Sequence, residues 1–323
     1  MIHLLFTGGT ISMQRDPAAG GNVPVHGGDA LVGFTPGLSK IGKYRIENWA
    51  MVPACHLGPE RLWALRERVR EVAESGEVQG IVITHGTDTI EETAYLLDRT
   101  LNPSVPVVIT GAMRTSGDPD WDGPSNLLHA AMVAADPRSS GRGVLVVFRG
   151  KILAGGAALK VHATDLDAFA APHAAPLGNV NDAALEYDPQ LTTETRLARL
   201  SGESRLQVAG LSARVALIPV VVGDDGRLLD LARSQYDGVV VEAFGSGNVP
   251  PGAVAAMRRW LSDGKPVVLA TRCHLGVVTP VYAFEGGGSR LVQMGAVPAG
   301  PRAPSQARME LTIALSAGFP YGS

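Results

Sequence analysis

The sequence has few cysteines, a modest share of charged residues and no long hydrophobic run. Its two cysteines, Cys55 and Cys273, make neither a disulfide framework nor a cysteine metal cluster. A net charge of −3 with 18% charged residues gives no electrostatic basis for binding nucleic acid. No apolar run reaches the roughly 18 residues of a membrane span, and the N-terminus lacks a basic segment followed by a hydrophobic signal core. We therefore expect a cytoplasmic protein with no membrane or nucleic-acid partner.

What the sequence does hold is glycine, proline and apolar residues. The 39 glycines, 22 prolines and 45% hydrophobic residues predict a compact, turn-rich α/β protein. A chain of 323 residues is long for one hydrophobic core, so two domains are expected. Residues 188–212 are polar with little strand character and are the best candidate for an interdomain linker. The predicted domains are therefore residues 1–187 and 213–323.

The most informative stretch is residues 80–94. The apolar run at 80–84 predicts a buried parallel strand, and helical periodicity begins shortly after it. Thr87, Asp88 and Thr89 would then lie between a strand C-terminus and a helix N-terminus. Open α/β sheets bind small ligands there, and free backbone N–H groups stabilise negative charge. The same residues also fit a plain helix start, because Asp88 and Thr89 each stand three residues before a glutamate, as in a capping box.

A second loop of similar kind follows the strand predicted at residues 2–6. Its sequence, Thr7-Gly-Gly-Thr10, combines a turn where the backbone can approach a ligand closely with a hydroxyl at the strand end. It is not the dinucleotide-binding fingerprint, because no helix with a third glycine follows and the ribose-binding acid is missing. Residues 14–42 lack clear periodicity, and we expect a long loop of the kind that often serves as a lid.

The remaining elements alternate between strands and helices, as in an α/β protein. Strands are predicted at residues 45–52, 106–110, 143–148, 215–222, 238–242 and 266–271, helices at 59–74, 252–261, 304–317 and from residue 124 onward, and a hairpin at 151–160.

Two further positions carry reactive side chains. Cys55 and His56 suggest a thiol–imidazole nucleophile, but neighbours in sequence seldom point at each other, and the partner histidine is usually distant in sequence. Lys160 is flanked by apolar segments, so it is either a functional amine or a surface residue whose stem lies over apolar neighbours. The sequence by itself leaves both alternatives open.

Several of these stretches together resemble the bacterial-type L-asparaginase and glutaminase-asparaginase family. The two threonine loops look like its paired signature, and further matching motifs follow in collinear order over nearly the whole chain. They are Thr7-Gly-Gly-Thr-Ile11, Thr84-His-Gly-Thr-Asp-Thr89, Gly111-Ala-Met-Arg114, Asp122-Gly-Pro-x-Asn-Leu127, Lys160 with Thr164-Asp165 and Ala168-Phe169, Gly245-Ser-Gly-Asn248, and Gln306-Ala-Arg308. The resemblance implies an α/β fold with a larger N-terminal parallel-sheet domain and a smaller C-terminal α/β domain.

The resemblance also implies a mechanism. Thr10 would attack the side-chain amide carbon and form an acyl-enzyme, and its hydroxyl needs a base nearby because it is a weak nucleophile. Lys160 would accept a proton, so that Thr87 becomes basic enough to activate Thr10 or the later water. Asp88 would complete this second group and hold the substrate α-ammonium. These four catalytic residues require no metal and no organic cofactor.

Substrate-binding residues are implied at further positions. Backbone N–H groups near Gly9 and Thr87 would form the oxyanion hole, usually the largest single catalytic contribution, and the carbonyl of Ala112 would receive the leaving amide. The implied set is Gly9, Cys55, His56, Gly86, Ala112, Asn248 and Glu285. The resemblance further implies a homodimer or homotetramer, with sites near the interface between one N-terminal domain and a neighbouring C-terminal domain.

Three departures from the family pattern bear on the substrate. The family carries a catalytic tyrosine in the lid loop, whereas the first tyrosine here is Tyr44; His26 is a candidate substitute as proton carrier, or else a solvated loop histidine. Cys55-His56 stands where the family has a serine and an amide or acid that bind the α-groups, and a thiol is a poor donor. The acidic residue supplied across the interface has no clean match, since Glu285 lies about two positions away.

The sequence therefore predicts hydrolysis of the side-chain amide of L-asparagine to aspartate and ammonia. One alternative is an amidase of the same fold that acts on a modified, D- or peptidyl asparagine or another small amide, which the altered α-group residues favour. The other is a non-catalytic amino-acid-binding homologue that has lost turnover.

Overall fold

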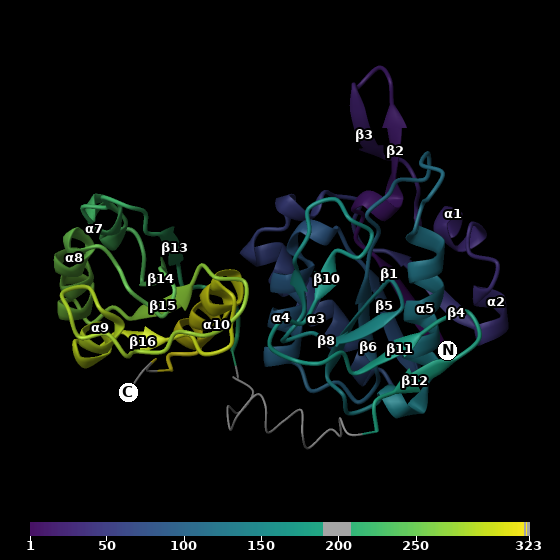
Figure 1. Cartoon of the computed structure of the whole chain (residues 1–323). Helices are drawn as coiled ribbons and strands as arrows, with labels where there is room; N and C mark the ends of the chain where they lie inside the picture. Colours follow the sequence, from purple (N-terminus) through teal and green to yellow (C-terminus); the bar gives the residue numbers. More distant parts are fainter. Residues whose placement is uncertain (190–207, 320, 322–323) are drawn as a thin grey trace. The chain divides into compact units, whose positions relative to one another are not determined.

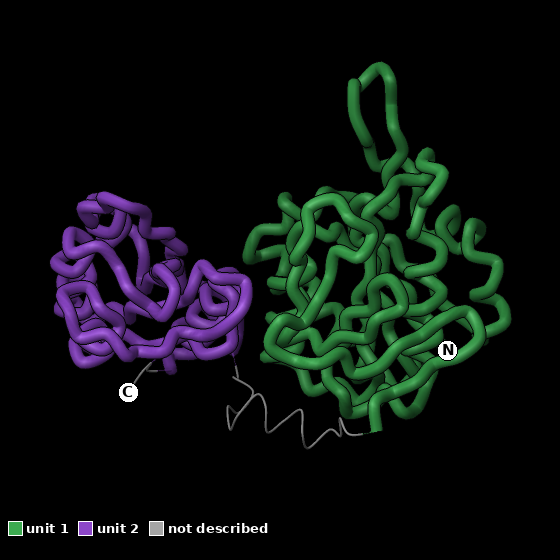
Figure 2. Tube along the Cα trace, in the orientation of Figure 1, with its two compact units in different colours: residues 1–205 green, residues 206–323 purple. Residues whose placement is uncertain are grey.

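The structure, a computed structural model, describes residues 1–189, 208–319 and 321. The chain forms two compact units, residues 1–205 and 206–323 (Figure 2). The boundary between them falls in the stretch predicted as a linker, most of which lies outside the described residues, so the predicted domain limits stay predictions. Each unit is an α/β structure with helices packed on a sheet (Figure 1), as the sequence predicted.

An eight-stranded sheet organises the first unit, in the order β12-β11-β8-β7-β6-β5-β1-β4. The strands from β7 to β4 run parallel, and β8, β11 and β12 add an antiparallel edge. Parallel strands buried on both faces are continuous apolar runs in sequence, which is why β1 and β5 could be predicted to the residue. The strands are β1 (Ile2–Phe6), β4 (Tyr44–Asn48), β5 (Gly80–Thr84), β6 (Val107–Thr110), β7 (Val144–Phe148), β8 (Lys151–Ala154), β11 (Gly178–Val180) and β12 (Leu185–Tyr187).

Helices cover both faces of this sheet, and each face has its own hydrophobic core. In β5, Ile81 and Ile83 pack with α3 and α4 on one face, whereas Val82 packs with α1, α2 and α5 on the other. This alternation follows from the two-residue period of a strand, and burial of these aliphatic side chains drives folding of the unit. The helices are α1 (Gly28–Gly33), α2 (Leu38–Ile41), α3 (Pro59–Glu74), α4 (Ile90–Thr100) and α5 (Gly123–Ala135).

The order of the strands changes direction at β1. This strand has β4 on one side and β5 on the other, and both are parallel to it. Phe6, the last residue of β1, pairs with Thr84, the last residue of β5, so the loops that follow leave the sheet side by side. Open α/β sheets bind ligands beyond the carboxyl ends of the strands at such a point. The topology therefore places the two threonine loops where a ligand site is expected.

Residues 14–42 are not the long irregular loop that the sequence predicted. They begin in an antiparallel hairpin of β2 (Met13–Asp16) and β3 (Gly21–Pro24), which projects from the body of the unit (Figure 1), and continue through α1 and α2. The hairpin strands are exposed or half-buried, so they show no alternation of apolar residues. The two helices have six and four residues, too few to establish a helical period.

The hairpin predicted at residues 151–160 is also wrong. Strand β8 instead pairs with β7 through a two-residue turn at Arg149 and Gly150, whose φ angles of 49° and 77° suit a tight hairpin. Residues Leu159–Lys160 form β9, which pairs with β10 (Phe169–Ala170). Strand β4 likewise ends at Asn48 and not at residue 52. The β9–β10 pairing matters for the site because it positions Lys160.

The second unit holds a four-stranded parallel sheet in the order β13-β14-β15-β16. Helices α7, α8 and α9 pack on one face and α10 on the other. The predicted strands and the helices α8 and α10 are confirmed within a few residues, whereas α7, α9 and β16 were not predicted. The elements are β13 (Val215–Pro219), α7 (Arg227–Arg233), β14 (Gly238–Ala243), α8 (Pro251–Ser262), β15 (Val267–Thr271), α9 (Gly288–Gln293), β16 (Val297–Pro298) and α10 (Pro304–Ser316). Over the residues that the structure describes, no helix is both long and apolar enough to cross a membrane.

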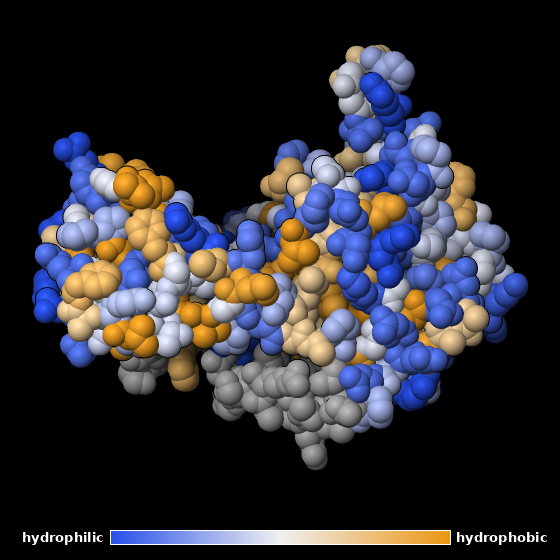
Figure 3. Space-filling model, viewed as in Figure 1, coloured by the Kyte–Doolittle hydropathy of each residue, from blue (hydrophilic) through white to orange (hydrophobic). Residues whose placement is uncertain are grey.

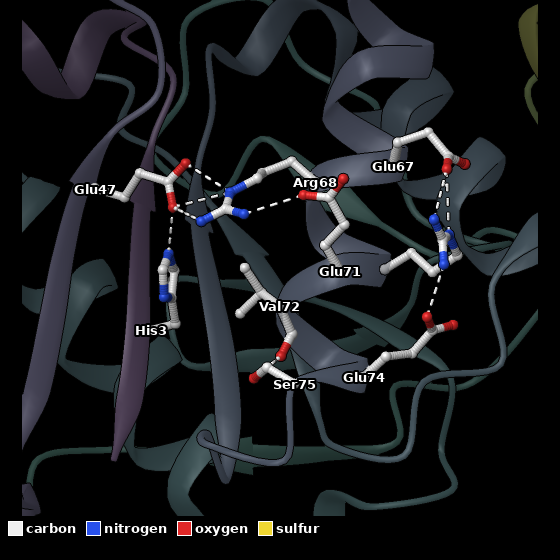
Figure 4. A network of polar contacts seen from close by, with 9 residues as sticks. His3, Glu47, Glu67, Arg68, Glu71, Val72, Glu74 and Ser75 are labelled. Carbon is white, nitrogen blue, oxygen red and sulfur yellow. Dashed lines mark hydrogen bonds and ion pairs between the residues drawn. The ribbon is translucent and has the colours of Figure 1, made fainter.

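A polar network joins β1 and β4 to α3 (Figure 4). His3 Nε2 lies 2.7 Å from Glu47 Oε2, and Arg68 Nε donates to the same carboxylate at 2.9 Å. Burial lowers the pKa of His3. Burial alone would raise the pKa of Glu47, but hydrogen bonds from Arg68 and His3 outweigh it and lower this pKa. The network fixes β1, whose C-terminal end leads into the Thr10 loop.

Candidate active site

Two glycine-bearing loops meet where β1 and β5 end. Gly9 has a φ of 84°, in the left-handed region that favours glycine, and a Cβ there would lie 2.4 Å from Gly86 Cα. Thr7 joins the same loops, since its N–H and its hydroxyl both donate to the Thr84 carbonyl, at 3.2 and 2.9 Å. The two backbones can approach this closely only because both contact residues lack a side chain.

The next residue in each loop carries a hydroxyl. Thr10 is partly exposed and begins a 3-10 turn (Thr10–Ser12), and Thr87 is buried and begins another (Thr87–Thr89). Lys160 Nζ donates to Thr87 Oγ1 at 2.9 Å and to Asp88 Oδ1 at 2.7 Å. The Lys160 side chain is only 15% exposed, whereas that of Asp88 is 71% exposed. Lys160 is thus not a surface residue that extends into solvent, and Asp88 presents a carboxylate to solvent beside the Thr87 hydroxyl.

Lys160 and the 3-10 turn are held by main-chain contacts. Pairing with Phe169 positions the Lys160 backbone, whose N–H donates to Glu91 Oε2 at 2.9 Å. No side-chain cap is formed at the start of this turn or of α4, so the capping-box interpretation of Asp88 and Thr89 is wrong. The Thr89 hydroxyl instead donates to a carbonyl of the neighbouring loop, that of Ala54, at 3.4 Å. The Asp88 carboxylate is therefore engaged by Lys160 and does not cap a helix.

His85 supports the loop from inside. It is fully buried, its Nδ1 lies 2.8 Å from the Gly86 carbonyl, and its Nε2 lies 3.1 Å from Thr93 Oγ1. Burial lowers the pKa of His85 to about 4, so the ring is neutral near pH 7. Because a carbonyl only accepts, Nδ1 carries the proton, and Nε2 accepts from Thr93. His85 is a supporting residue for which no role was predicted from the sequence.

A third loop, residues 111–114, packs on the Thr87 loop. A Cβ at Gly111 would lie 2.4 Å from the His85 carbonyl oxygen, and the Gly111 carbonyl accepts from Asn126 Nδ2 at 3.0 Å. Asp122 accepts from the backbone N–H groups of Met113 and Arg114, at 3.0 and 2.9 Å. These polar side chains from the start of α5 fix the loop that contains the buried Ala112.

Cys55 and His56 lie on a short 3-10 helix (Ala54–His56) at the rim of the same region. A Cβ at Gly86 would lie 2.7 Å from Ala54 Cβ, so this helix contacts the Thr87 loop directly. Both side chains are exposed, and in the part of the chain that the structure describes no hydrogen bond joins them. The geometry gives no support to a thiol–imidazole nucleophile.

His26 is not a solvated loop histidine. Its ring is partly buried, and its Nε2 lies 2.7 Å from Ser116 Oγ. Within the described residues no hydrogen bond joins it to Thr10, Thr87 or Lys160, so proton transfer by His26 stays a prediction.

Asn248 and Glu285 belong to the second unit. Asn248 Oδ1 accepts from the N–H of Gly288, which lies 40 residues away in the same unit, at 3.1 Å, and Glu285 is exposed. Their predicted contact with substrate stays a prediction. The structure thus brings together Gly9, Thr10, Gly86, Thr87, Asp88, Lys160, Ala112, Cys55 and His56 within the first unit.

The chemistry of this site follows from its groups. It offers two hydroxyls, one shielded amine, one open carboxylate and the backbone N–H groups of two tight turns. Among the described residues, no three His, Cys, Asp or Glu side chains are arranged to hold a metal ion. Such a set suits acyl transfer to a hydroxyl, with an amine as proton acceptor.

Comparison with known proteins gives a consistent result over both units. Residues 1–193 match the family model of the N-terminal asparaginase domain, and residues 214–321 match that of the glutaminase/asparaginase C-terminal domain. A probable L-asparaginase from Deinococcus radiodurans is 37% identical over 98% of this chain and 93% of its own length. L-asparaginase 2 of Escherichia coli is 31% identical over 98% of this chain and 88% of its own length. A solved structure, of a probable cytoplasmic L-asparaginase from Campylobacter jejuni, is similar with a TM-score of 0.83 and 28% identity, over 98% of this chain and 94% of that one.

Proposed function

Because the chain belongs to the asparaginase and glutaminase-asparaginase family, we propose that it hydrolyses the side-chain amide of L-asparagine to aspartate and ammonia. The observation that carries this proposal is the pair of hydrogen bonds from Lys160 Nζ to Thr87 Oγ1 and Asp88 Oδ1. This group lies beside a loop that presents a second threonine, Thr10, at a sheet edge suited to ligands.

The first half of the reaction forms an ester on Thr10. Its Oγ attacks the amide carbon, and its proton passes to Lys160 through the Thr87 hydroxyl. The amide oxygen becomes an oxyanion, which the backbone N–H groups of Gly9 and Thr87 stabilise. The C–N bond then breaks as the proton held by Lys160 passes back through Thr87 to the nitrogen, and ammonia leaves past the carbonyl of Ala112.

The second half hydrolyses that ester. Water takes the place of ammonia, Thr87 and Lys160 accept its proton, and its oxygen attacks the acyl carbon. The Thr10–acyl bond breaks as that proton passes from Lys160 through Thr87 to Thr10 Oγ, and aspartate leaves. Throughout, Asp88 holds the substrate α-ammonium; its Oδ1 bonds Lys160, and its side chain is open to solvent.

An altered amide is the second candidate substrate, and the Cys55-His56 pair favours it. Both side chains are exposed on a helix that contacts the Thr87 loop. A thiol is a weaker hydrogen-bond donor than a hydroxyl, so it binds a carboxylate less well. Discrimination among substrates depends on such partners, because a polar substrate group without one is bound poorly. An asparagine with blocked or modified α-groups would lose less binding affinity at this site than free asparagine.

We further propose that the enzyme is a cytoplasmic homodimer or homotetramer. Residues 275–284 of the second unit expose several large apolar side chains, and Figure 3 shows apolar surface on this unit. They are Leu275, Val277, Val281, Tyr282 and Phe284. Apolar groups that gather in this way often mark an interface, and a second copy would cover them. Light scattering behind size exclusion should give at least twice the 33.7 kDa of one chain.

The test of the activity is ammonia release from L-asparagine, D-asparagine, L-glutamine, an N-blocked asparagine and a simple carboxamide. The Thr10→Ala variant is the control, because it removes the attacking hydroxyl, together with one methyl group. Release from L-asparagine that depends on Thr10 would support the first proposal. Release only from a blocked or altered amide would favour the second candidate. No release at all, with a ligand still raising the melting temperature, would point to a binding protein without turnover.

A further inference from the structure

The two ends of the β2–β3 hairpin are tied together at its base. The chain enters the hairpin from Ser12, and the residues that leave it, Val25 and His26, both return to that position. Their backbone N–H groups donate to the Ser12 carbonyl at 2.8 and 3.0 Å. The base of the hairpin is therefore hydrogen-bonded to Ser12, the last residue of the 3-10 turn that begins at Thr10.

The His26 side chain adds a second tie through the 115–118 turn. Its Nε2 lies 2.7 Å from Ser116 Oγ, and Ser116 donates its N–H and its hydroxyl to the Met13 carbonyl at 3.1 and 3.3 Å. Ser116 is 90 residues away in sequence, so the fold alone brings the two together. The imidazole also packs against Phe34 and Trp121, with ring centroids at 5.3 and 6.5 Å, which limits its orientation.

These ties lead directly to Thr10. The Met13 N–H donates to the Thr10 carbonyl, and the Ser12 N–H donates to the Gly9 carbonyl at 2.9 Å. Ser12 and Met13, the two residues held by His26 and Ser116, are thus the ones that close the turn around Thr10. A change at the hairpin base would be transmitted to the threonine hydroxyl through main-chain hydrogen bonds.

We propose that His26 is a positioning residue for Thr10, which acts by clamping the base of the β2–β3 hairpin to Ser116. This inference rests on the proposed function, because it takes Thr10 as the nucleophile. This role differs from proton transfer by His26. His26 Nε2 is engaged by the Ser116 hydroxyl. The clamp needs that hydrogen bond, but His26 exchanges no proton with the substrate.

The test compares four single variants and one double variant of the full-length protein. His26→Leu and Ser116→Ala each remove the hydrogen bond, His26→Gln keeps a polar group of similar reach, and His173→Leu is a matched control at an exposed histidine. We expect His26→Leu and Ser116→Ala each to lower kcat by about tenfold, the effect of one typical hydrogen bond, with KM changed less than about twofold. The double variant should lose no more than about threefold beyond Ser116→Ala, because both changes remove the His26–Ser116 contact, while Ser116→Ala also removes the hydroxyl's hydrogen bond to the Met13 carbonyl.

Two further readouts separate positioning from proton transfer and from plain instability. Trypsin should cleave after Arg15, which is exposed in β2, several times faster in His26→Leu and Ser116→Ala than in wild type, while His173→Leu matches wild type. His26→Gln should keep kcat within about threefold of wild type, with an unchanged pH profile of kcat/KM. A shared loss of kcat without faster cleavage would overturn the clamp.

Other results would also overturn it. Unchanged kcat in Ser116→Ala would show that the contact does not position Thr10. Loss of activity in His26→Gln equal to that in His26→Leu, with one limb of the pH profile missing, would assign His26 to proton transfer. If the proposed function is wrong, Thr10→Ala will still release ammonia. The comparison of trypsin cleavage rates tests the clamp independently of that result.

Discussion

Replacing Gly9 with alanine should remove most of the activity while leaving the fold in place. The new Cβ would lie 2.4 Å from Gly86 Cα, and ordinary contacts begin at 3.4 Å, so the two loops would have to separate by about 1 Å. Both partners are backbone, so no side-chain rotation can relieve the contact. A displacement of about 1 Å between reacting groups can cost about 100-fold in rate. We therefore expect kcat to fall by about 100-fold.

The matched control is Gly141→Ala. Gly141 has a φ of 72°, close to the 84° of Gly9, but a Cβ there would meet nothing within 4 Å. Both variants therefore include the strain of alanine in a left-handed conformation, on the order of 1–2 kcal/mol, and only Gly9→Ala adds the contact between loops. The assay is kcat for ammonia release together with the midpoint of thermal unfolding. If Gly9→Ala keeps more than a tenth of wild-type kcat, or if Gly141→Ala loses as much, the close approach of the loops is not what positions the nucleophile.

Three further changes test the surroundings of the site. Lys160→Met should lower kcat by about 100-fold or more, as expected for loss of a proton acceptor, whereas Lys151→Met, which breaks an exposed ion pair, should leave kcat unchanged; equal losses would contradict the assignment. His85 has a folded pKa of about 4, below its unfolded value near 6.5, so the unfolded chain binds the proton first as pH falls. The free energy of unfolding should therefore drop by roughly 3 kcal/mol between about pH 6.5 and pH 4, and urea titrations should find that component absent in His85→Gln; the same slope in both proteins would refute it. Asp122→Ala should lower kcat/KM by about tenfold, since it leaves two backbone N–H groups of the 111–114 loop without their acceptor, and wild-type kinetics would show that this loop needs no such support.

The elements predicted most accurately are those whose burial is evident from the pattern of apolar residues in a short stretch of sequence. Strands β1 and β5 are short apolar runs buried on both faces, and α3 starts at Pro59 with apolar residues at helical spacing. The hairpin β2–β3 and the helices α1 and α2 could not be predicted in this way. Their strands are largely exposed and their helices too short, so pairing within the fold, and not local propensity, determines them.

The candidate site was predicted in part by resemblance and not by local pattern. Nothing near Lys160 indicates that its amine reaches Thr87, 73 residues away, and by itself the lysine fits a surface position equally well. The two glycines of the touching loops were visible in the motifs, but their contact depends on the register of β1 against β5. His85 and the clamp between His26 and Ser116 were missed because each is defined by partners that only the folded chain supplies.

The central claim is that Thr10 carries the acyl group, and trapping the intermediate tests it most directly. The enzyme would be mixed with the best substrate of the amide panel, quenched in acid within the first turnovers, digested and mapped by mass spectrometry. We expect an acyl adduct on the peptide of residues 1–15, at Thr10, and none in Thr10→Ala. An adduct on the peptide of residues 46–61, at Cys55, would contradict it and assign the nucleophile to the thiol.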